Sequence, residues 1–370
     1  MIQSISSISD FENIRREWDK LYLMSGANNL FLTHGWLVNW VKHFGKDRWV
    51  VIVERLRDEN DLSAAGIFQI TESGIGFIDT LYSHFPGILH EKGHPVPLRE
   101  IVQHLKKVYN TAAIHLVESP QEDSFLAEIK SAVGMRWQIL ERNVHMMRSI
   151  AIQGDFESYL NTKSKKLRHE LERKNRKMEK EGATELRCLD KASELDELFR
   201  IIEDVENDSW KFRSGTAVIS SESEQNFYKS VFKLYSSISA AKGYVLYHKN
   251  IPVTYVLGII FDGTYYALKT SFKESVSNLS PGTVLFFRLL EKLNSGDPRI
   301  SKIELLGGDA RWKSELCTDA GSYCTYVLYP MRPLSLLYVA GYRYLRPIIK
   351  RLPISEGYLN RLRRIAGYFQ

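Results

Sequence analysis

The sequence predicts an α/β (α+β) protein of two similar halves, each a mixed sheet with flanking helices, followed by a basic helical tail. Two observations indicate this fold class. One order of elements, two helices, three strands and then alternating helix and strand, occurs twice along the chain. The length of 370 residues suits two packed domains, and 44% hydrophobic residues can form cores of that size. We expect the divisions 1–150, 151–330 and 331–370.

The first half is expected to open with two helices, because apolar residues recur there at helical spacing. Phe11, Ile14 and Trp18 form such a stripe, and Asp10 can cap the first helix. Residues 83–97 are rich in Pro and Gly and predict a loop. The expected elements are helices 10–24 and 34–44, strands 49–56, 63–70 and 75–82, helix 98–110, strand 112–118, helix 122–133 and strand 136–142.

The second half repeats that order without repeating the residues. Gly182 and Gly243 are expected to end helices, while Asn250 and the pair Asp262-Gly263 predict the two turns of a three-stranded meander. The expected elements are helices 155–181, 193–209 and 222–242, strands 244–247, 252–260 and 265–270, helix 282–294, strand 302–306, helix 310–316 and strand 323–329.

Targeting and redox signals favour a cytoplasmic protein. No stretch approaches the roughly 18 apolar residues of a membrane span, and residues 1–13 lack the basic and apolar regions of a secretory signal. The three cysteines have no metal-ligand spacing, and their odd number argues against a disulfide framework. The histidines form no metal-ligand pattern either, so we expect no metal site.

The positive charge of the chain is concentrated in its tail. Residues 331–370 contain eight basic residues and one acid, whereas the first 330 residues are close to neutral, so the body is not a basic, nucleic-acid-like surface. Apolar and basic residues mix over 334–350. That pattern fits a helix on an anionic membrane surface, and it equally fits a helix packed on the body, which Gly341 and the tyrosines favour slightly.

The start of helix 282–294 is a candidate phosphate site. The segment Ser280, Pro281, Gly282 and Thr283 offers free backbone N–H groups at the positive end of a helix, and glycine lets a ligand approach the backbone. The helix would start beside a strand where the sheet changes from antiparallel to parallel, a preferred place for ligands. An ordinary helix start has the same sequence pattern, so the motif alone is weak.

Segments of the second half carry a family resemblance. The clearest stretch is YYALKTSFKESVSNLSPGTVLFFRLLEKL followed by IELLGGDARWKSEL, and residues 36–40 and 164–182 add to it. These segments resemble the CelD-like branch of the GNAT acyltransferases, which is similar in turn to the Fem-type aminoacyl transferases of peptidoglycan synthesis. The resemblance implies two tandem GNAT-like domains, a degenerate first one and a catalytic second one, with acyl-CoA as co-substrate and no permanently bound cofactor.

The chain also departs from that family. Members often have Asp where Glu304 stands, Tyr where Trp312 stands and Trp where Leu316 stands. A tyrosine hydroxyl is therefore lost beside Lys313. The Gly-rich pyrophosphate signature of typical GNAT acetyltransferases is missing too, so an acyl-CoA longer than acetyl-CoA remains possible as donor.

The resemblance implies direct transfer of the acyl group from a thioester held between splayed strands near 265–270 and 302–306. A backbone N–H would polarise the carbonyl, and a base would deprotonate the acceptor. Asp309 is the first candidate base, and a helix N-cap is an equally good interpretation of it. Lys313 lies one helical turn on and could pair with Asp309 or hold an anionic acceptor, or simply be solvated. Glu304 is the second carboxylate candidate.

Other residues are expected on the substrate side. Arg168 and Arg173 belong to a basic helix that could hold phosphates, or could be solvated and paired with its own acids. Trp210 and Lys211 form an aromatic and basic loop, which is either substrate-binding or an ordinary core tryptophan and turn. Lys269 and Ser271 face one side of a strand by alternation, either toward the acceptor or toward solvent. His84 and His94 could line an acceptor groove, although surface loop positions fit them better.

Two classes of function follow. The first is an acyl-CoA-dependent acyltransferase (N-acyl or O-acyl transfer) acting on an amino sugar, amino acid or polysaccharide precursor. Its Fem-type subclass would use aminoacyl-tRNA, but the sequence has no pair of long inserted helices. The second class is a non-catalytic accessory protein of polysaccharide biosynthesis, with peripheral membrane or complex contacts through the tail. Acyl-CoA binding distinguishes the two classes, and steeply salt-dependent RNA binding would indicate the tRNA subclass.

Overall fold

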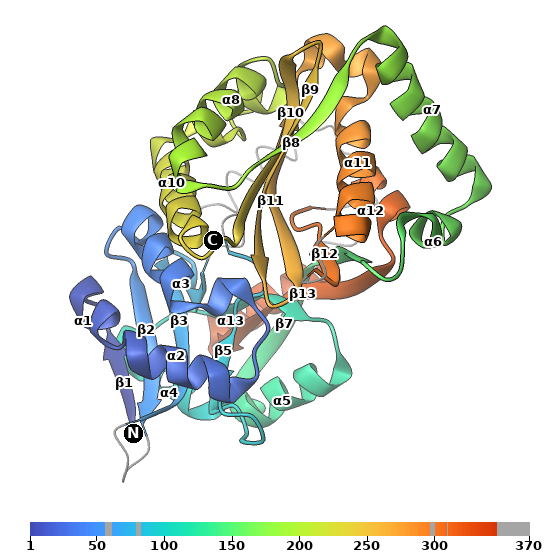
Figure 1. The fold of residues 1–370 in the computed structure, drawn as a ribbon. Helices are drawn as coiled ribbons and strands as arrows, with labels where there is room; N and C mark the ends of the chain where they lie inside the picture. Colours follow the sequence, from blue (N-terminus) through green and yellow to red (C-terminus); the bar gives the residue numbers. More distant parts are fainter. Residues whose placement is uncertain (56–60, 79–82, 297–299, 309, 346–370) are drawn as a thin grey trace.

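The computed structural model describes residues 1–55, 61–78, 83–296, 300–308 and 310–345 (Figure 1). Its helices are α1 (Ile8–Asn13), α2 (Arg15–Ser25), α3 (His34–Trp40), α4 (Leu98–Tyr109), α5 (Asp123–Val133), α6 (Phe156–Asn161), α7 (Lys165–Glu181), α8 (Leu195–Asn207), α9 (Trp210–Arg213), α10 (Glu222–Ser236), α11 (Pro281–Gly296), α12 (Arg311–Leu316) and α13 (Pro333–Ala340). Its strands are β1 (Ile2–Ile5), β2 (Trp49–Arg55), β3 (Leu62–Thr71), β4 (Gly74–Phe77), β5 (Ile88–His90), β6 (Ile114–Pro120), β7 (Trp137–Ala151), β8 (Thr184–Leu189), β9 (Ala241–His248), β10 (Ile251–Phe261), β11 (Thr264–Phe272), β12 (Lys302–Glu304) and β13 (Asp319–Pro330).

Local chemistry accounts for several of these boundaries. Ser164 caps α7 by accepting a hydrogen bond from the backbone N–H of Leu167. The meander turns fall at Asn250 (φ 63°) and at Asp262 and Gly263 (φ 43° and 73°), left-handed conformations that suit Asn, Asp and Gly. Both turns confirm the sequence-based assignment.

Gly243 does not end a helix, contrary to the prediction. Helix α10 already stops at Ser236, and Gly243 lies inside β9. A Cβ atom at this position would come within 2.7 Å of the Leu198 side chain, so the glycine lets α8 pack closely on the strand. The same residue type therefore serves packing rather than capping here.

The strands form one continuous sheet in which the two halves exchange their last strands. The order is β1-β2-β3-β4-β6-β13-β7-β12-β11-β10-β9-β8, with β5 paired to β3. Strand β13 of the second half lies between β6 and β7 of the first, and it is antiparallel to both. Strand β7 in turn pairs with β12 of the second half. The sheet therefore does not break at residue 150, although the expected division falls near the end of β7.

Helices cover both faces of the sheet. One face carries α1, α2, α3, α8 and α10, and their apolar side chains join those of both halves in a single core (Figure 1). The opposite face has separate cores, one under α4 and α5 and one under α6, α7, α11 and α12. The shared core places the α1–α3 side of the first half against the α8 and α10 side of the second.

The described part of the tail packs on the body. Helix α13 and the π-helical turn Gly341–Leu345 lie on β7 and β13. Tyr338 stacks on Tyr329 with ring centroids 5.4 Å apart, and the Arg343 guanidinium donates to the Ile139 carbonyl oxygen at 2.8 Å. Residues 346–370, which hold most of the basic charge of the tail, lie outside the described residues. None of the described helices is both long and apolar enough to cross a membrane.

The predicted fold class is confirmed, with differences in detail. Helix 10–24 is divided in two at Ile14, and the predicted helix 34–44 ends in a π-helical turn, η2 (Val41–Gly45). The sequence analysis missed β1, β5 and β8, which are short strands at or beside the sheet edges. Strand β7 extends to Ala151, well beyond the predicted residue 142, because it bridges the two halves.

Candidate active site

Strands β11 and β12 part in the middle of the second half. They pair in parallel only from Thr264 to Tyr266, while β11 continues to Phe272. At the point of parting, the register of β11 on β10 skips Leu268, which forms a β-bulge. A strand that leaves its neighbour exposes backbone N–H and C=O groups along that edge. This parting lies where the sequence analysis expected the thioester, between 265–270 and 302–306.

Glu304 lies at the last paired position of β12. A cross-strand row runs from Tyr266 through Glu304 and Ser149 to Asp319, and directly paired residues share a face of the sheet. That face is the shared core, since Tyr266 packs edge-on against Phe31 at 5.4 Å. Burial raises the pKa of the Glu304 carboxyl, and its ion pair with Lys302 opposes that effect. Glu304 thus lies on the face of the shared core and is buried there, and its role as a base stays a prediction.

Lys313 holds the loop after β12. Its Nζ donates to the carbonyl oxygens of Leu306 and, at 3.1 Å, of Gly308. Leu306 and Gly307 both have positive φ (25° and 68°), and the lysine satisfies the carbonyls of this turn. Trp312 packs on Phe286 with ring centroids 4.6 Å apart. Asp309, the first candidate base, lies outside the described residues.

The candidate phosphate segment sits at the start of α11. Ser280 takes the left-handed conformation (φ 54°), and its carbonyl oxygen accepts the N–H groups of Thr283 and Val284 at 3.0 and 3.1 Å. Pro281 is buried, whereas Gly282 and Thr283 are half-buried. Lys177 of α7 reaches this region, since its Nζ donates to the Asn278 carbonyl oxygen at 2.9 Å. A cation therefore stands beside the helix start.

Lys211, Lys269 and Ser271 come together under α8 and α10. The Nζ of Lys211 donates to the Thr270 carbonyl oxygen at 2.6 Å, and the Nζ of Lys269 lies 2.7 Å from the Glu224 carboxylate. Burial, and then the neighbouring Lys269, lowers the pKa of Lys211. The buried Ser271 Oγ has no hydrogen-bond partner among the described residues. Trp210 begins α9 and is 47% exposed, so it is not a core tryptophan.

Arg168 and Arg173 are not part of that group. Both lie on α7, on the opposite face of the sheet from α8 and α10 (Figure 1). Arg168 donates to the Asn161 side chain at 2.6 Å. Ion pairs one turn apart, Lys174 with Glu170 and Arg176 with Glu172, run along the same helix. The structure thus separates the expected substrate-binding residues into two sets.

A histidine and a carboxylate form a pair where the two halves of the chain meet, and the sequence analysis gave this pair too little weight. His84 is not a surface histidine, because its side chain is 12% exposed and its Nδ1 lies 3.1 Å from the Glu118 carboxylate. The Phe85 N–H donates to the same carboxylate at 2.9 Å. Glu118 was not singled out, since no local pattern marks a glutamate in a strand. Its only sequence signal is a charge at the end of the run 112–118, which is apolar except for His115.

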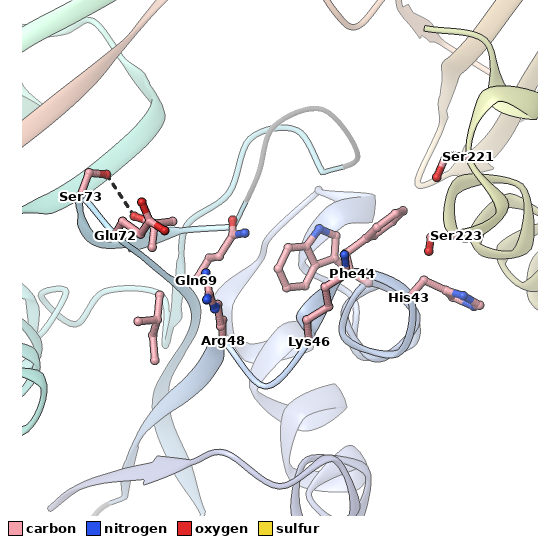
Figure 2. Close-up of a pocket in the computed structure, with 13 residues that line it drawn as sticks. His43, Phe44, Lys46, Arg48, Gln69, Glu72, Ser73, Ser221 and Ser223 are labelled. Atoms are coloured by element: carbon pink, nitrogen blue, oxygen red, sulfur yellow. Dashed lines mark hydrogen bonds between the residues drawn. The ribbon is translucent and has the colours of Figure 1, made fainter. Parts of the chain in front are cut away.

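A cavity among the described residues lies elsewhere. Figure 2 shows this space of about 660 Å³, lined by the η2 turn, the β3–β4 turn and the start of α10. Lys46 and Arg48 line it, and Glu72 lies at the opposite end from Ser221 and Ser223. None of the residues predicted for the site lines this cavity. Among the described residues, no cluster of His, Cys, Asp and Glu could hold a metal ion.

Comparisons with known proteins agree with this architecture. Residues 165–314 match the model of the acetyltransferase (GNAT) domain family. FemX has a similar structure, with a TM-score of 0.59, 11% identity, and coverage of 91% of this chain and 100% of that one. The C-terminal domain of a putative lysylphosphatidylglycerol synthetase from Agrobacterium fabrum has a TM-score of 0.56 and 10% identity, and the match covers 92% of this chain and 97% of that one. A tandem GNAT protein from the clavulanic acid biosynthesis pathway has a TM-score of 0.51 and 10% identity, and the match covers 88% of this chain and 98% of that one.

No curated protein matches the sequence. The family match and the shared fold confirm the predicted resemblance to the GNAT superfamily, with similarity to a Fem-type protein. The parted strands, Glu304 and the start of α11 all lie within the matched segment 165–314. The CelD-like branch stays a prediction.

Proposed function

We propose that this chain, in which residues 165–314 form a GNAT-type domain of a transferase, is an acyl-CoA-dependent acyltransferase of the EC 2.3.1 class. Its acceptor would be an amino sugar, an amino acid or a polysaccharide or cell-envelope precursor, and transfer would be to nitrogen or oxygen. The observation that carries the proposal is the parting of β11 from β12 inside the matched segment, with the β-bulge of Leu268 at the branch point.

The proposed donor site follows the elements in order. The acyl thioester lies between the parted strands, where a free backbone N–H of β11 polarises its carbonyl. The CoA phosphates meet the first turn of α11 at the Gly282 backbone and the Thr283 hydroxyl, and Lys177 adds a positive charge beside them. The half-buried state of Gly282 and Thr283 leaves that turn partly open to a ligand.

Thermal unfolding in the presence of a series of acyl-CoAs tests the proposal. A ligand that binds only the folded state raises the melting temperature, by about 2.7 kcal/mol of free energy at one hundred times its Kd. We expect stabilisation that depends on acyl chain length and exceeds that given by free CoA. Equal melting temperatures with every acyl-CoA, with CoA and without ligand would rule out acyl-CoA as the donor.

A Fem-type enzyme that uses aminoacyl-tRNA is the second candidate. Helix α7 favours it, because exposed cations such as Arg173 and Lys177 lie along a helix on the outside of the matched domain. RNA binding that weakens steeply with salt, together with no acyl-CoA stabilisation, would support this alternative. Binding of neither ligand would leave the non-catalytic accessory role as the remaining candidate.

The proposed setting is the cytoplasm, with the protein either free or peripheral to the inner face of the membrane. The basic residues of 331–370 are the proposed contact to an anionic membrane or to a biosynthetic complex. Vesicles with and without anionic lipid, tested against the full chain and a chain ending at residue 345, would measure this contact.

A further inference from the structure

Backbone irregularities in three neighbouring strands meet at one point of the sheet. Glu118 in β6 and Asn143 in β7 both have positive φ (45° and 53°). Between these strands, the register of β13 shifts after Tyr323 on β7 and after Cys324 on β6. Left-handed non-glycine residues and bulges cost free energy and concentrate at functional sites. Here they surround a single pair of side chains.

That pair is His84 and Glu118. The Glu118 carboxylate is held from two sides, by the Phe85 N–H at 2.9 Å and by His84 Nδ1 at 3.1 Å. A carboxylate beside Nδ1 favours the tautomer with the proton on Nδ1, which leaves Nε2 as the proton acceptor. Nε2 makes no hydrogen bond to the described part of the chain. His145 Nε2 lies 3.7 Å from the same carboxylate, and the Tyr323 ring stacks near His145 and Phe85.

The pair faces the parted strands of the second half. The Phe31 ring lies between His84 and Tyr266, with ring centroids 5.6 and 5.4 Å away, and Tyr266 is paired with Glu304 across the strands. Between Tyr323 and Asp319 the strand carries Gly321, and the Tyr323 ring lies against it, since a Cβ atom at Gly321 would come within 3.0 Å of that ring. Asp319, Ala320 and Gly321 are all exposed to solvent. An acceptor would reach this face of the sheet from that exposed end of β13.

We infer that His84 is the base on the acceptor side and that Glu118 is its positioning residue. This inference rests on the proposed function. The acceptor N–H or O–H gives its proton to His84 Nε2 while its nitrogen or oxygen bonds to the thioester carbonyl carbon. The C–S bond then breaks, and the CoA sulfur takes the proton from the imidazolium. The first half thus supplies a catalytic residue to a reaction whose donor site lies in the second.

The test measures CoA release from the most strongly stabilising acyl-CoA, with hydroxylamine as the acceptor, as a function of pH. Protonated imidazole cannot accept a proton, so the wild-type kcat falls on the acid side. We expect His84→Gln to lower kcat about 100-fold or more and to remove that acid limb, because general bases contribute about 10²–10⁴. Its stabilisation by acyl-CoA should be unchanged. Glu118→Gln should lower kcat less and shift the pH at which kcat falls on the acid side.

Two controls separate the alternatives. His104→Gln changes a histidine of α4 that has no proposed role, where His104 Nε2 is 2.7 Å from the Ser4 hydroxyl, and should leave kcat and its pH profile unchanged. Glu304→Gln tests the carboxylate that is the other candidate base. His145 and Tyr323 are the other titratable groups that face the pair of His84 and Glu118. Melting temperatures report whether each variant is folded. If His84→Gln does not fold, Glu118→Gln still tests the assignment.

Each outcome has a defined meaning. An acid limb that persists in both His84→Gln and Glu118→Gln, or that disappears only in Glu304→Gln, would overturn the assignment of His84. A wild-type protein that no acyl-CoA stabilises would overturn the proposed donor and this inference together. A wild-type protein that is stabilised and turns over, with His84→Gln equally active, would overturn the inference alone.

Discussion

At the scale of single residues, Glu206 and Tyr255 form a fully buried polar pair beneath α8. The Tyr255 hydroxyl donates to one Glu206 carboxylate oxygen at 2.6 Å, and the Ile219 N–H donates to the other at 3.1 Å. Both side chains are at most 1% exposed. Burial, and then the Glu206 charge, raises the pKa of Tyr255 well above its usual value, so the hydroxyl remains a donor.

Tyr255→Phe should therefore destabilise the protein. The change leaves a buried carboxylate oxygen without its donor, which costs about 1–3 kcal/mol. The free energy of unfolding from urea titration measures this loss. Tyr344→Phe, at a position 70% exposed, is the matched control and should change the free energy by less than about 0.5 kcal/mol. Equal stability of Tyr255→Phe and wild type would mean that Glu206 finds another donor.

The residues that the sequence analysis proposed for the site are those with a local signal or a family motif. Ser280 to Thr283 were identified because a Ser-Pro-Gly turn before an apolar helix is readable in four residues, and Lys269 because strand alternation is local. Glu304 was identified through a family motif. His84 was judged a surface histidine, since the partner that buries it lies 34 residues away and is turned toward it by strand irregularities that no local pattern encodes.

At the scale of elements, helix α7 combines two roles that its sequence left open. Leu171 and Met178 pack into the core under α11, while ion pairs such as that of Arg176 with Glu172 line its exposed side. Lys177 differs from these paired cations, because it reaches the carbonyl of Asn278 just before the start of α11. The solvated-helix interpretation therefore fits Arg176, and the phosphate-binding interpretation fits Lys177.

Lys177→Ala should weaken acyl-CoA binding about three- to tenfold, because a charge beside the proposed phosphate position is lost. Arg176→Ala, on the adjacent residue, should leave the affinity unchanged, since Arg176 is engaged by Glu172 at 3.4 Å. Isothermal titration with the preferred acyl-CoA measures both. Identical affinities for the two variants would show that the CoA phosphates do not lie beside α7.

Element boundaries were predicted best where turns carry their own chemistry. The Asn250 and Asp262-Gly263 turns fixed the β9–β10–β11 meander to within a few residues. The bulge at Leu268 was not foreseen, because it reflects the pairing of β11 with two different neighbours. Strand β8 was missed as well, since its polar and apolar residues alternate over only six positions after a long helix.

At the scale of the whole molecule, the exchange of β7 and β13 joins the two halves. In each half the last two strands run in the same direction, with one strand of the other half inserted antiparallel between them. Cys324, Tyr326 and Leu328 of β13 also belong to the core under α4 and α5. Sequence periodicity predicts which residues form a strand, but it does not reveal which other strands that strand pairs with, so the exchange was not predictable.

This exchange predicts that a chain cut after Gly154 gives two pieces that fold only together. The piece 1–154 lacks β13, and closing the gap would move β6 and β7 together by about one strand spacing, roughly 4.8 Å, and require parallel pairing. We expect each piece alone to show no cooperative thermal transition, and the two pieces expressed together to co-purify with one transition near that of the intact chain. A sharp transition of 1–154 alone would show that the halves are independent domains, and that His84 could then be held in place without the second half.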